Sequence, residues 1–467
     1  MTITSHRNVW FAPFRYILLG VLCGISFSCN DAPGPVGSGL IPADNLSIVT
    51  ISSDTLQLLS GAVVGQFPPR MESDIAQPTS TNPVFIGAAI ANDNPSTFIT
   101  ATTFLSFNPP VLNDSIRDAS FSNLTPNDII SASLLVSPLE YILGDSQRQV
   151  ASFRIHSVTR PWYVDNTQHA INLQDPALIG RQVGANQSKG TDTIRLDASQ
   201  TLSRKVQLPI TDKSLILRWL KTGTVAWSSV DGLALVPDTT TARTMYALGN
   251  GSTVVIRLRS TTSETGDTLI FMNEFARAGL VRSTLPDNSR SDSIIVQGGA
   301  ALRTRLDFDL SRLPPFAVIH RAELVLNVDT IRSTISNLGL PLSVQLYPAQ
   351  NAVFPAAQRA FQSQRNSISA VSATGFFDNT TGTARYIFSS NLNMASVVEN
   401  IVKNGGKQSM ILQLQPEFVT GTSSQRSDEE QTTTRIVFHG LRQQDSTLRL
   451  LRPRLVITYS NRYSVPR

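Results

Sequence analysis

The sequence is poor in cysteine, in recognised catalytic motifs and in long apolar runs. Only two of its 467 residues are cysteines, Cys23 and Cys29, too few for a disulfide framework. The spacings typical of a nucleophile elbow, a zincin helix, a P-loop, a dinucleotide-binding turn or a CxxC site do not occur. After Phe27 there is no apolar stretch of about 18 residues, the length that indicates a transmembrane helix. We therefore expect a protein that is not an enzyme and needs no cofactor.

The N-terminal segment has the organisation of a bacterial lipoprotein signal peptide. His6, Arg7 and Arg15 are basic, and the apolar run at residues 16–27 is shorter than the roughly 20 residues that span a bilayer. Small residues precede Cys29, although Phe27 stands where a small or β-branched residue is more usual. We expect residues 1–28 to be removed and Cys29 to be acylated. The alternatives are ordinary cleavage that leaves Cys29 unmodified, and an uncleaved membrane anchor.

Removal of this segment changes the net charge and the cysteine content of the chain. The net charge of +5 loses Arg7 and Arg15, and 5 − 2 = +3 is too small to indicate nucleic-acid binding. No free thiol would remain, so hydrophobic cores must hold the exported chain together.

Residues 29–45 include a Pro- and Gly-rich stretch and predict a tether. The expected location is the cell envelope, as an outer-membrane lipoprotein on the periplasmic face or the cell surface, held to the membrane by its N-terminal lipid.

The remaining chain has the pattern of an all-β protein. Short alternating runs of apolar residues are separated every ten residues or so by Pro, Gly, Asn or Asp, which is typical of β-sandwiches. About 440 residues are too many for one ordinary β domain and suit two of about 200. We predict two tandem domains at residues 46–262 and 267–462, with a boundary near residues 261–266.

The two predicted domains share a sequence pattern, which indicates duplication. In the second, apolar residues alternate along residues 302–310 and again along residues 321–328. Residues 102–110 and 124–138 are a looser version in the first. Each domain then has one apolar run at helical spacing closed by glycine, and a final alternating strand at residues 252–260 or 452–460. The side chains predicted to face the cores from these two helices are Leu215, Ile216, Trp219, Leu220, Val397, Val398, Ile401 and Val402.

The order FDLSRLPP, AVIHRAELVL, a short helix ending in NGG, and RPRLVITY resembles the DNRLRE-type β-sandwich family, which is related to carbohydrate-binding modules. Residues 29–58 also resemble the start of an uncharacterised lipoprotein family of Bacteroidota. The first resemblance covers most of the second half of the chain and implies a jelly-roll-like, carbohydrate-binding-like sandwich on an exported lipoprotein. The shared sequence pattern predicts the same fold for the first half. The resemblance implies no catalytic residues.

The candidate ligand-binding residues are aromatic side chains beside polar ones, because rings stack on the apolar face of sugars. They are Trp162, Tyr163 and Asp165 in RPWYVDN, and Trp227 in AWSSVDG. The structural alternative is that Trp162 caps the sandwich core. Asp307 and Asp309 are weak candidates for a hard cation, and the alternative is a solvated face paired with Arg303 and Arg305.

The leading hypothesis is a non-catalytic envelope lipoprotein whose surface binds a glycan or an envelope protein. The alternatives are a structural or adhesion lipoprotein that docks a partner through a sheet edge, and an unrecognised hydrolase built around His156 or His169. A further pattern, Asp-Ser/Thr followed by an apolar residue or Thr, is similar to the O-glycosylation site of exported Bacteroidota proteins, and it also suits strand entries. It occurs at Asp54, Asp114, Asp192, Asp238, Asp267, Asp292, Asp329 and Asp445.

Overall fold

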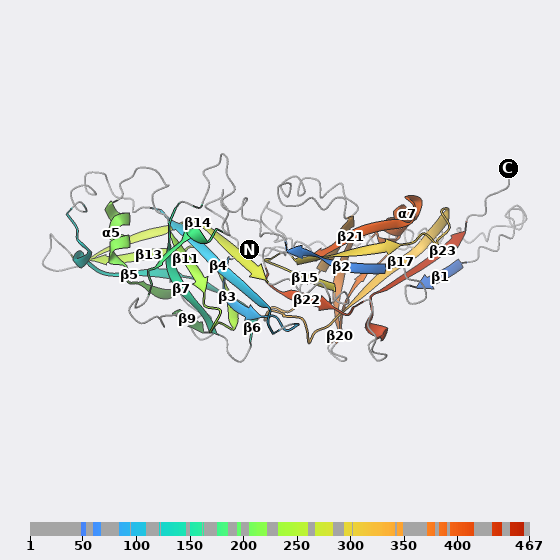
Figure 1. Cartoon of the computed structure of the whole chain (residues 1–467), viewed down its shortest axis with the longest axis horizontal. Coiled ribbons are helices and arrows are strands. Elements are labelled where there is room, and N and C mark those ends of the chain that lie inside the picture. The colour runs from blue at the N-terminus through green and yellow to red at the C-terminus, as the bar shows by residue number, and fades with distance from the viewer. Residues whose placement is uncertain are drawn as a thin grey trace, which may run out of the picture. The chain divides into compact units, whose positions relative to one another are not determined.

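The described part of the chain is built mainly of antiparallel strands. The computed structural model describes residues 48–52, 59–66, 84–93, 95–108, 121, 123–145, 150–160, 162, 175–184, 194–197, 205–221, 232–259, 267–283, 294–300, 302–340, 343–348, 371–378, 383–389, 393–414, 432–440 and 449–461. Within them the strands form two sheets, one of twelve strands and one of eleven, with two α-helices (Figure 1). Val49–Arg467 form one compact unit. The predicted all-β class is confirmed.

The twelve-stranded sheet lies within residues 84–283, which we call the first body. Its strands are β3 (Val84–Ile90), β4 (Phe98–Phe107), β5 (Ile129–Val136), β6 (Pro138–Gly144), β7 (Val150–Val158), β8 (Ile179–Gln182), β9 (Ile194–Asp197), β10 (Val206–Ile210), β11 (Leu233–Pro237), β12 (Thr244–Leu248), β13 (Thr253–Leu258) and β14 (Thr268–Ser283). The main path is β10-β5-β13-β14-β4-β11-β7-β8, with β3, β6, β9 and β12 off it. The long strand β14 pairs first with β13 and then with β4, with a register shift between Glu274 and Ala276.

The eleven-stranded sheet contains residues 48–66 and 294–461, which we call the second body. Its strands are β1 (Ile48–Ser52), β2 (Leu59–Gln66), β15 (Ile294–Gln297), β16 (Leu302–Asp309), β17 (Ala317–Val328), β18 (Ser343–Pro348), β19 (Val371–Asp378), β20 (Thr383–Phe388), β21 (Lys407–Leu414), β22 (Arg435–Phe438) and β23 (Arg454–Asn461). The path is β1-β23-β17-β20-β19-β18-β21-β16-β15-β22, and β2 pairs with β16. A pairing of Val328 with Phe438 joins β22 back to β17, so the part of the path from β17 to β22 is closed, and β23 and β1 lie outside it.

Sheet membership does not follow the predicted ranges of 46–262 and 267–462. Strands β1 and β2 come from the first range but pair with β23 and β16 of the second sheet. Strand β14 begins after residue 266 but belongs to the first sheet, because it forms an antiparallel pair with β13 and buries Ile270 and Met272 in the first core. The first body is thus inserted in the sequence between β2 and β15, and the chain passes between the bodies twice.

The alternating patterns place the core residues as predicted. Leu302, Thr304, Leu306, Phe308 and Leu310 are all buried, as are the alternate residues of β17 from Ala322 to Val328. The exception is Arg303, which the pattern places on the solvent face and which is only 7% exposed. Each body has its own large apolar cluster, and Ile51 of β1 packs against that of the second.

Among its described residues, each body has one short α-helix, and the buried face of that helix is the predicted one. Helix α5 (Lys213–Lys221) begins after Asp212, whose carboxylate accepts a hydrogen bond from the Leu215 backbone N–H at 3.0 Å, as an N-cap does. It buries Leu215, Ile216, Trp219 and Leu220. Helix α7 (Met394–Lys403) buries Val397, Val398, Ile401 and Val402, and the chain leaves it through two glycines with positive φ, Gly405 and Gly406. None of the helices in the described residues is long and apolar enough to cross a membrane.

Candidate functional site

Trp162, the first candidate for stacking on a sugar, is completely buried. Its ring centroid lies 5.8 Å from that of Phe104, and it shares an apolar cluster with Val158, Leu178 and Ala234. A ring with no exposed face cannot stack on a ligand, so Trp162 has the core position of the structural alternative. The other predicted residues, Tyr163, Asp165, Trp227 and the lipidation residue Cys29, lie outside the described residues.

The weak cation candidates, Asp307 and Asp309, are paired with basic and hydroxyl groups. Asp307 accepts a hydrogen bond from the Ser409 hydroxyl at 2.5 Å and lies 3.1 Å from Arg305 Nε. Asp309 accepts one from the Ser311 hydroxyl at 2.6 Å and lies 3.1 Å from Lys407 Nζ. The Ser311 hydrogen bond, followed by Lys407, lowers the pKa of Asp309 to about 2. The described residues contain no group of three His, Cys, Asp or Glu side chains placed to hold a metal.

One described histidine, His320, lies beside a serine hydroxyl. His320 Nε2 lies 2.8 Å from the hydroxyl of Ser460, which is the distance of a nucleophile–base pair. Ser460 is only 3% exposed, however, and no carboxylate is seen bonded to His320 in the described chain. His156 Nδ1 contacts the Gly180 carbonyl at 2.9 Å, and His169 lies outside the described residues. The pKa of His439 is lowered by burial, against the opposing effect of Asp329.

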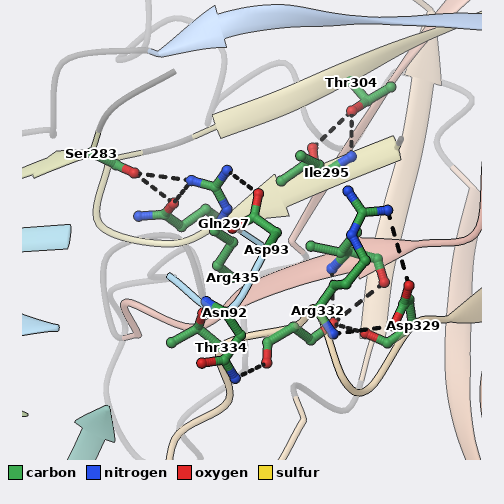
Figure 2. A network of polar contacts seen from close by, with 12 residues as sticks. Asn92, Asp93, Ser283, Ile295, Gln297, Thr304, Asp329, Arg332, Thr334 and Arg435 are labelled. Carbon is green, nitrogen blue, oxygen red and sulfur yellow. Dashed lines mark hydrogen bonds and ion pairs between the residues drawn. The ribbon is translucent and has the colours of Figure 1, made fainter. Parts of the chain in front are cut away.

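The most developed polar cluster lies where the two bodies meet, and we call it the junction. It comprises Asn92, Asp93, Tyr141 and Ser283 of the first body, and Gln297, residues 333–337 and residues 432–435 of the second. At its centre Arg435 Nη2 donates to Asp93 Oδ2 at 2.6 Å (Figure 2). The Arg435 side chain is fully buried, and the Asp93 side chain is 4% exposed. Arg435 Nη1 donates to Ser283 Oγ at 3.2 Å and to Gln297 Oε1 at 3.3 Å. One arginine of the second body thus bonds two elements of the first.

Burial lowers the pKa of Arg435, and the neighbouring Asp93 carboxylate opposes this shift. A buried guanidinium loses its hydration and depends on its protein partners for compensation. Breaking such a pair by removing one partner typically costs about 3–5 kcal/mol. The Asp93–Arg435 pair therefore favours the arrangement in which the two bodies are in contact.

Residues 333–337 belong to the second body and hydrogen-bond both to strand β22 of that body and to the first body. Thr334 exchanges two backbone hydrogen bonds of 2.9 Å with Arg435 of β22, and its hydroxyl accepts from the Asn92 backbone N–H at 2.8 Å. Asn337 covers the edge of β6, because its amide oxygen accepts from the Ile142 N–H at 2.6 Å and its backbone N–H donates to the Ile142 carbonyl at 2.9 Å. This segment thus extends the backbone pairing from one sheet to the other and covers an edge that would otherwise be open.

Tyr141 and Gly299 add close packing to the junction. The Tyr141 ring meets Phe85 edge-on at 5.1 Å, and its hydroxyl accepts a hydrogen bond from the Thr433 backbone N–H at 2.8 Å. Gly299 has φ +68°, and a Cβ there would lie 2.9 Å from both γ-carbons of Val281. Gly298 is restricted within the second body itself, since a Cβ there would lie 2.1 Å from the Thr432 carbonyl oxygen. The junction is therefore a dense seam that positions the two bodies.

The sequence analysis did not identify the junction. Asp93 and Asn337 lie in turns, where polar residues are common, and Tyr141 lies in an ordinary strand. The one available signal was Arg435, a charge at the start of the otherwise apolar strand RIVF.

The structure places three of the Asp-Ser/Thr triplets in described residues, and in each the hydroxyl residue is exposed: Thr239, Thr268 and Thr330. Two of the aspartates also have a local role. Asp238 accepts from the Thr240 backbone N–H at 3.1 Å, and Asp329 from that of Arg332 at 3.1 Å. Turn capping thus accounts for the aspartate at these two sites, and glycosylation remains a prediction. No protein-family model and no curated protein matches this sequence.

Proposed function

We propose that this chain is a non-catalytic lipoprotein of the cell envelope, in which two jelly-roll-like β-sandwich bodies form one rigid platform that presents a binding surface. The observation that carries the proposal is the junction. At the junction, a buried ion pair, backbone hydrogen bonds and close packing hold the two bodies together. A platform of this kind suits recognition, which benefits from a surface that is ordered before it binds.

The envelope location depends on acylation of Cys29. We expect mass spectrometry of the N-terminal peptide from native membranes to show residues 1–28 removed and acyl chains on Cys29. A Cys29→Ser chain should then appear in the soluble fraction, because the covalent lipid supplies the membrane affinity. An intact leader, or Cys29 without lipid in the membrane fraction, would refute the proposal.

For the ligand, the proposal favours a glycan, and a protein is the alternative. Because Trp162 is buried, Tyr163 and Trp227 are the aromatic residues to test. On a glycan array we expect the intact protein to bind, and Tyr163→Ala or Trp227→Ala to reduce binding. The conservative core change Trp162→Phe serves as the control that should bind normally.

Docking of a protein strand at a sheet edge is the protein alternative. Residues 333–337 cover the edge of β6, so an incoming strand would have to displace them there. β1 ends the path of its sheet with β23 as its partner, so its other edge is the described position at which a strand would add. Stable co-purification of one partner from detergent-solubilised membranes, together with no glycan binding, would support the protein alternative.

A further inference from the structure

We propose that the end of the second body that carries Phe316 lies against the lipid surface to which the chain is anchored. This inference rests on the proposed acylation of Cys29 and adds to it the surface that faces the bilayer. We call this surface the Phe316 end. It comprises the turn of residues 310–316, the turn of residues 403–407, the start of β1 and the end of β23.

The elements of the Phe316 end are joined by described contacts. The Leu310 backbone N–H donates to the Gly406 carbonyl at 2.6 Å, which connects the two turns. Ala317, directly after Phe316, pairs with Asn461 at the end of β23. β1 is the next strand beyond β23, and Figure 1 shows its arrow running opposite to that of β23. The start of β1 is therefore two strand spacings, about 10 Å, from β17 at this end.

The tether reaches the described chain at this same end. Residues 29–47 separate Cys29 from β1, and 19 residues span at most about 60–70 Å when extended. Such a tether keeps the second body close to the membrane without fixing which face meets it. Lipid attachment becomes more stable when a second element contacts the bilayer, so a surface near the tether is well placed for this.

Phe316 has the properties of a residue held out for such a contact. Its side chain is 74% exposed, although phenylalanine is usually buried. The turn that carries it is ordered by two backbone hydrogen bonds of 2.9 Å, Leu313 N–H to the Leu310 carbonyl and Ala317 N–H to the Pro314 carbonyl. Its exposure thus follows from the local backbone structure.

The charges around Phe316 favour an anionic lipid surface. Arg312 is exposed, and Lys403 and Lys407 extend from the neighbouring turn with 60% and 69% of their side chains exposed. Glu399 and Asp309 pair with the two lysines, so these five residues sum to 3 − 2 = +1. An exposed aromatic side chain with basic neighbours is the combination that binds the interface of an anionic bilayer.

The test places an environment-sensitive fluorophore at single cysteines. The acylated full-length protein is reconstituted in vesicles of phosphatidylethanolamine and phosphatidylglycerol, and its N-terminal peptide is first checked for acylation by mass spectrometry. The mature chain has no free thiol when Cys29 is acylated, so Phe316→Cys is labelled at one position. Ile331→Cys and Leu450→Cys are the matched controls, because these side chains are even more exposed, at 86% and 89%.

Both control positions lie at the opposite end of β17. Ile331 follows the last residue of β17, and the Leu451 carbonyl next to Leu450 accepts from Asn327 Nδ2 at 3.1 Å. A strand of 12 residues is about 35–40 Å long, far more than the depth of an interfacial contact. Contact of the Phe316 end with lipid therefore predicts different results at the two ends.

We expect spin-labelled lipid to quench the fluorophore at residue 316 several-fold more than at residues 331 and 450, and aqueous iodide to show the reverse order. Equal quenching at all three positions in an acylated, vesicle-bound protein would overturn the inference while leaving the anchor intact. A concentration-dependent emission shift at residue 316 without lipid quenching would also overturn it, in favour of contact with a second copy. Absence of acylation would refute the proposed function, and the inference with it.

Discussion

Replacing Asp93 with alanine removes the carboxylate that pairs with the buried guanidinium of Arg435. Both side chains are almost completely shielded from solvent, at 4% and 0% exposure, so water cannot replace the lost partner without opening the junction. Removal of one member of a buried pair costs about 3–5 kcal/mol. Arg435 keeps its hydrogen bonds to Ser283 and Gln297, so we expect the lower value, about 3 kcal/mol.

Equilibrium urea unfolding measures this loss, and two optical signals separate the bodies. Trp162 and Trp219 are both buried in the first body, so tryptophan fluorescence follows that body, whereas far-UV circular dichroism follows the strands of both. If the junction couples the bodies, the two signals coincide in the wild-type protein and diverge in Asp93→Ala. The matched control is Arg305→Ala, which removes an ion pair whose side chains are 49% and 34% exposed. An exposed pair contributes at most about 1 kcal/mol.

A double variant tests the reasoning further. Asp93→Leu combined with Arg435→Met replaces the pair by apolar groups, and such replacements are often close to neutral. We therefore expect the double variant to be more stable than Asp93→Ala. A loss below about 1 kcal/mol for Asp93→Ala would refute the assignment of this pair as a main contact of the junction.

Three further predictions concern other parts of the chain. Gly299→Ala should destabilise the protein by more than Gly339→Ala in thermal melts. Both glycines have positive φ, but only a Cβ at residue 299 would meet neighbouring atoms. Equal losses would show that the junction is not tightly packed at residue 299. Removal of β1 and β2 should increase hydrogen exchange in β16 and β23 of the second body and leave β4 of the first protected, and the opposite result would contradict the sheet assignment. The pKa of Asp309 is lowered to about 2, so the ionised carboxylate contributes fully to stability above the ordinary aspartate pKa near 4, and this contribution is lost as the pH falls toward 2. Lys407→Ala should raise the pKa of Asp309 in an NMR titration, and an unchanged pKa would exclude the ion pair in solution.

Local patterns predicted much of the secondary structure. The buried faces of α5 and α7 and the inward residues of β16 and β17 match the expected residues, because amphipathic periodicity is a property of consecutive residues and survives in any fold that has a core. The same patterns could not show which strands pair. Strand β2 has its partner, β16, more than 200 residues away, and that pairing leaves no periodic signal.

The candidate site depended still more on long-range contacts. Trp162 follows a proline and precedes polar residues, a context that suits an exposed loop, yet Phe104 and Val158 surround it with apolar side chains. Arg435 and Asp93 are 342 residues apart, and an arginine at the first position of a strand has the same sequence pattern whether folding buries it or leaves it exposed. The two differ only in the neighbours that folding supplies.

The sequence by itself determined the all-β class, the positions of both helices and the residues that form the two cores, since these follow from local hydrophobic periodicity. Only the tertiary structure decided that the first body is inserted between β2 and β15, that Trp162 is buried and that Asp93 meets Arg435. Each of these depends on pairing and desolvation between distant segments, and such contacts are set by the packing of the whole chain.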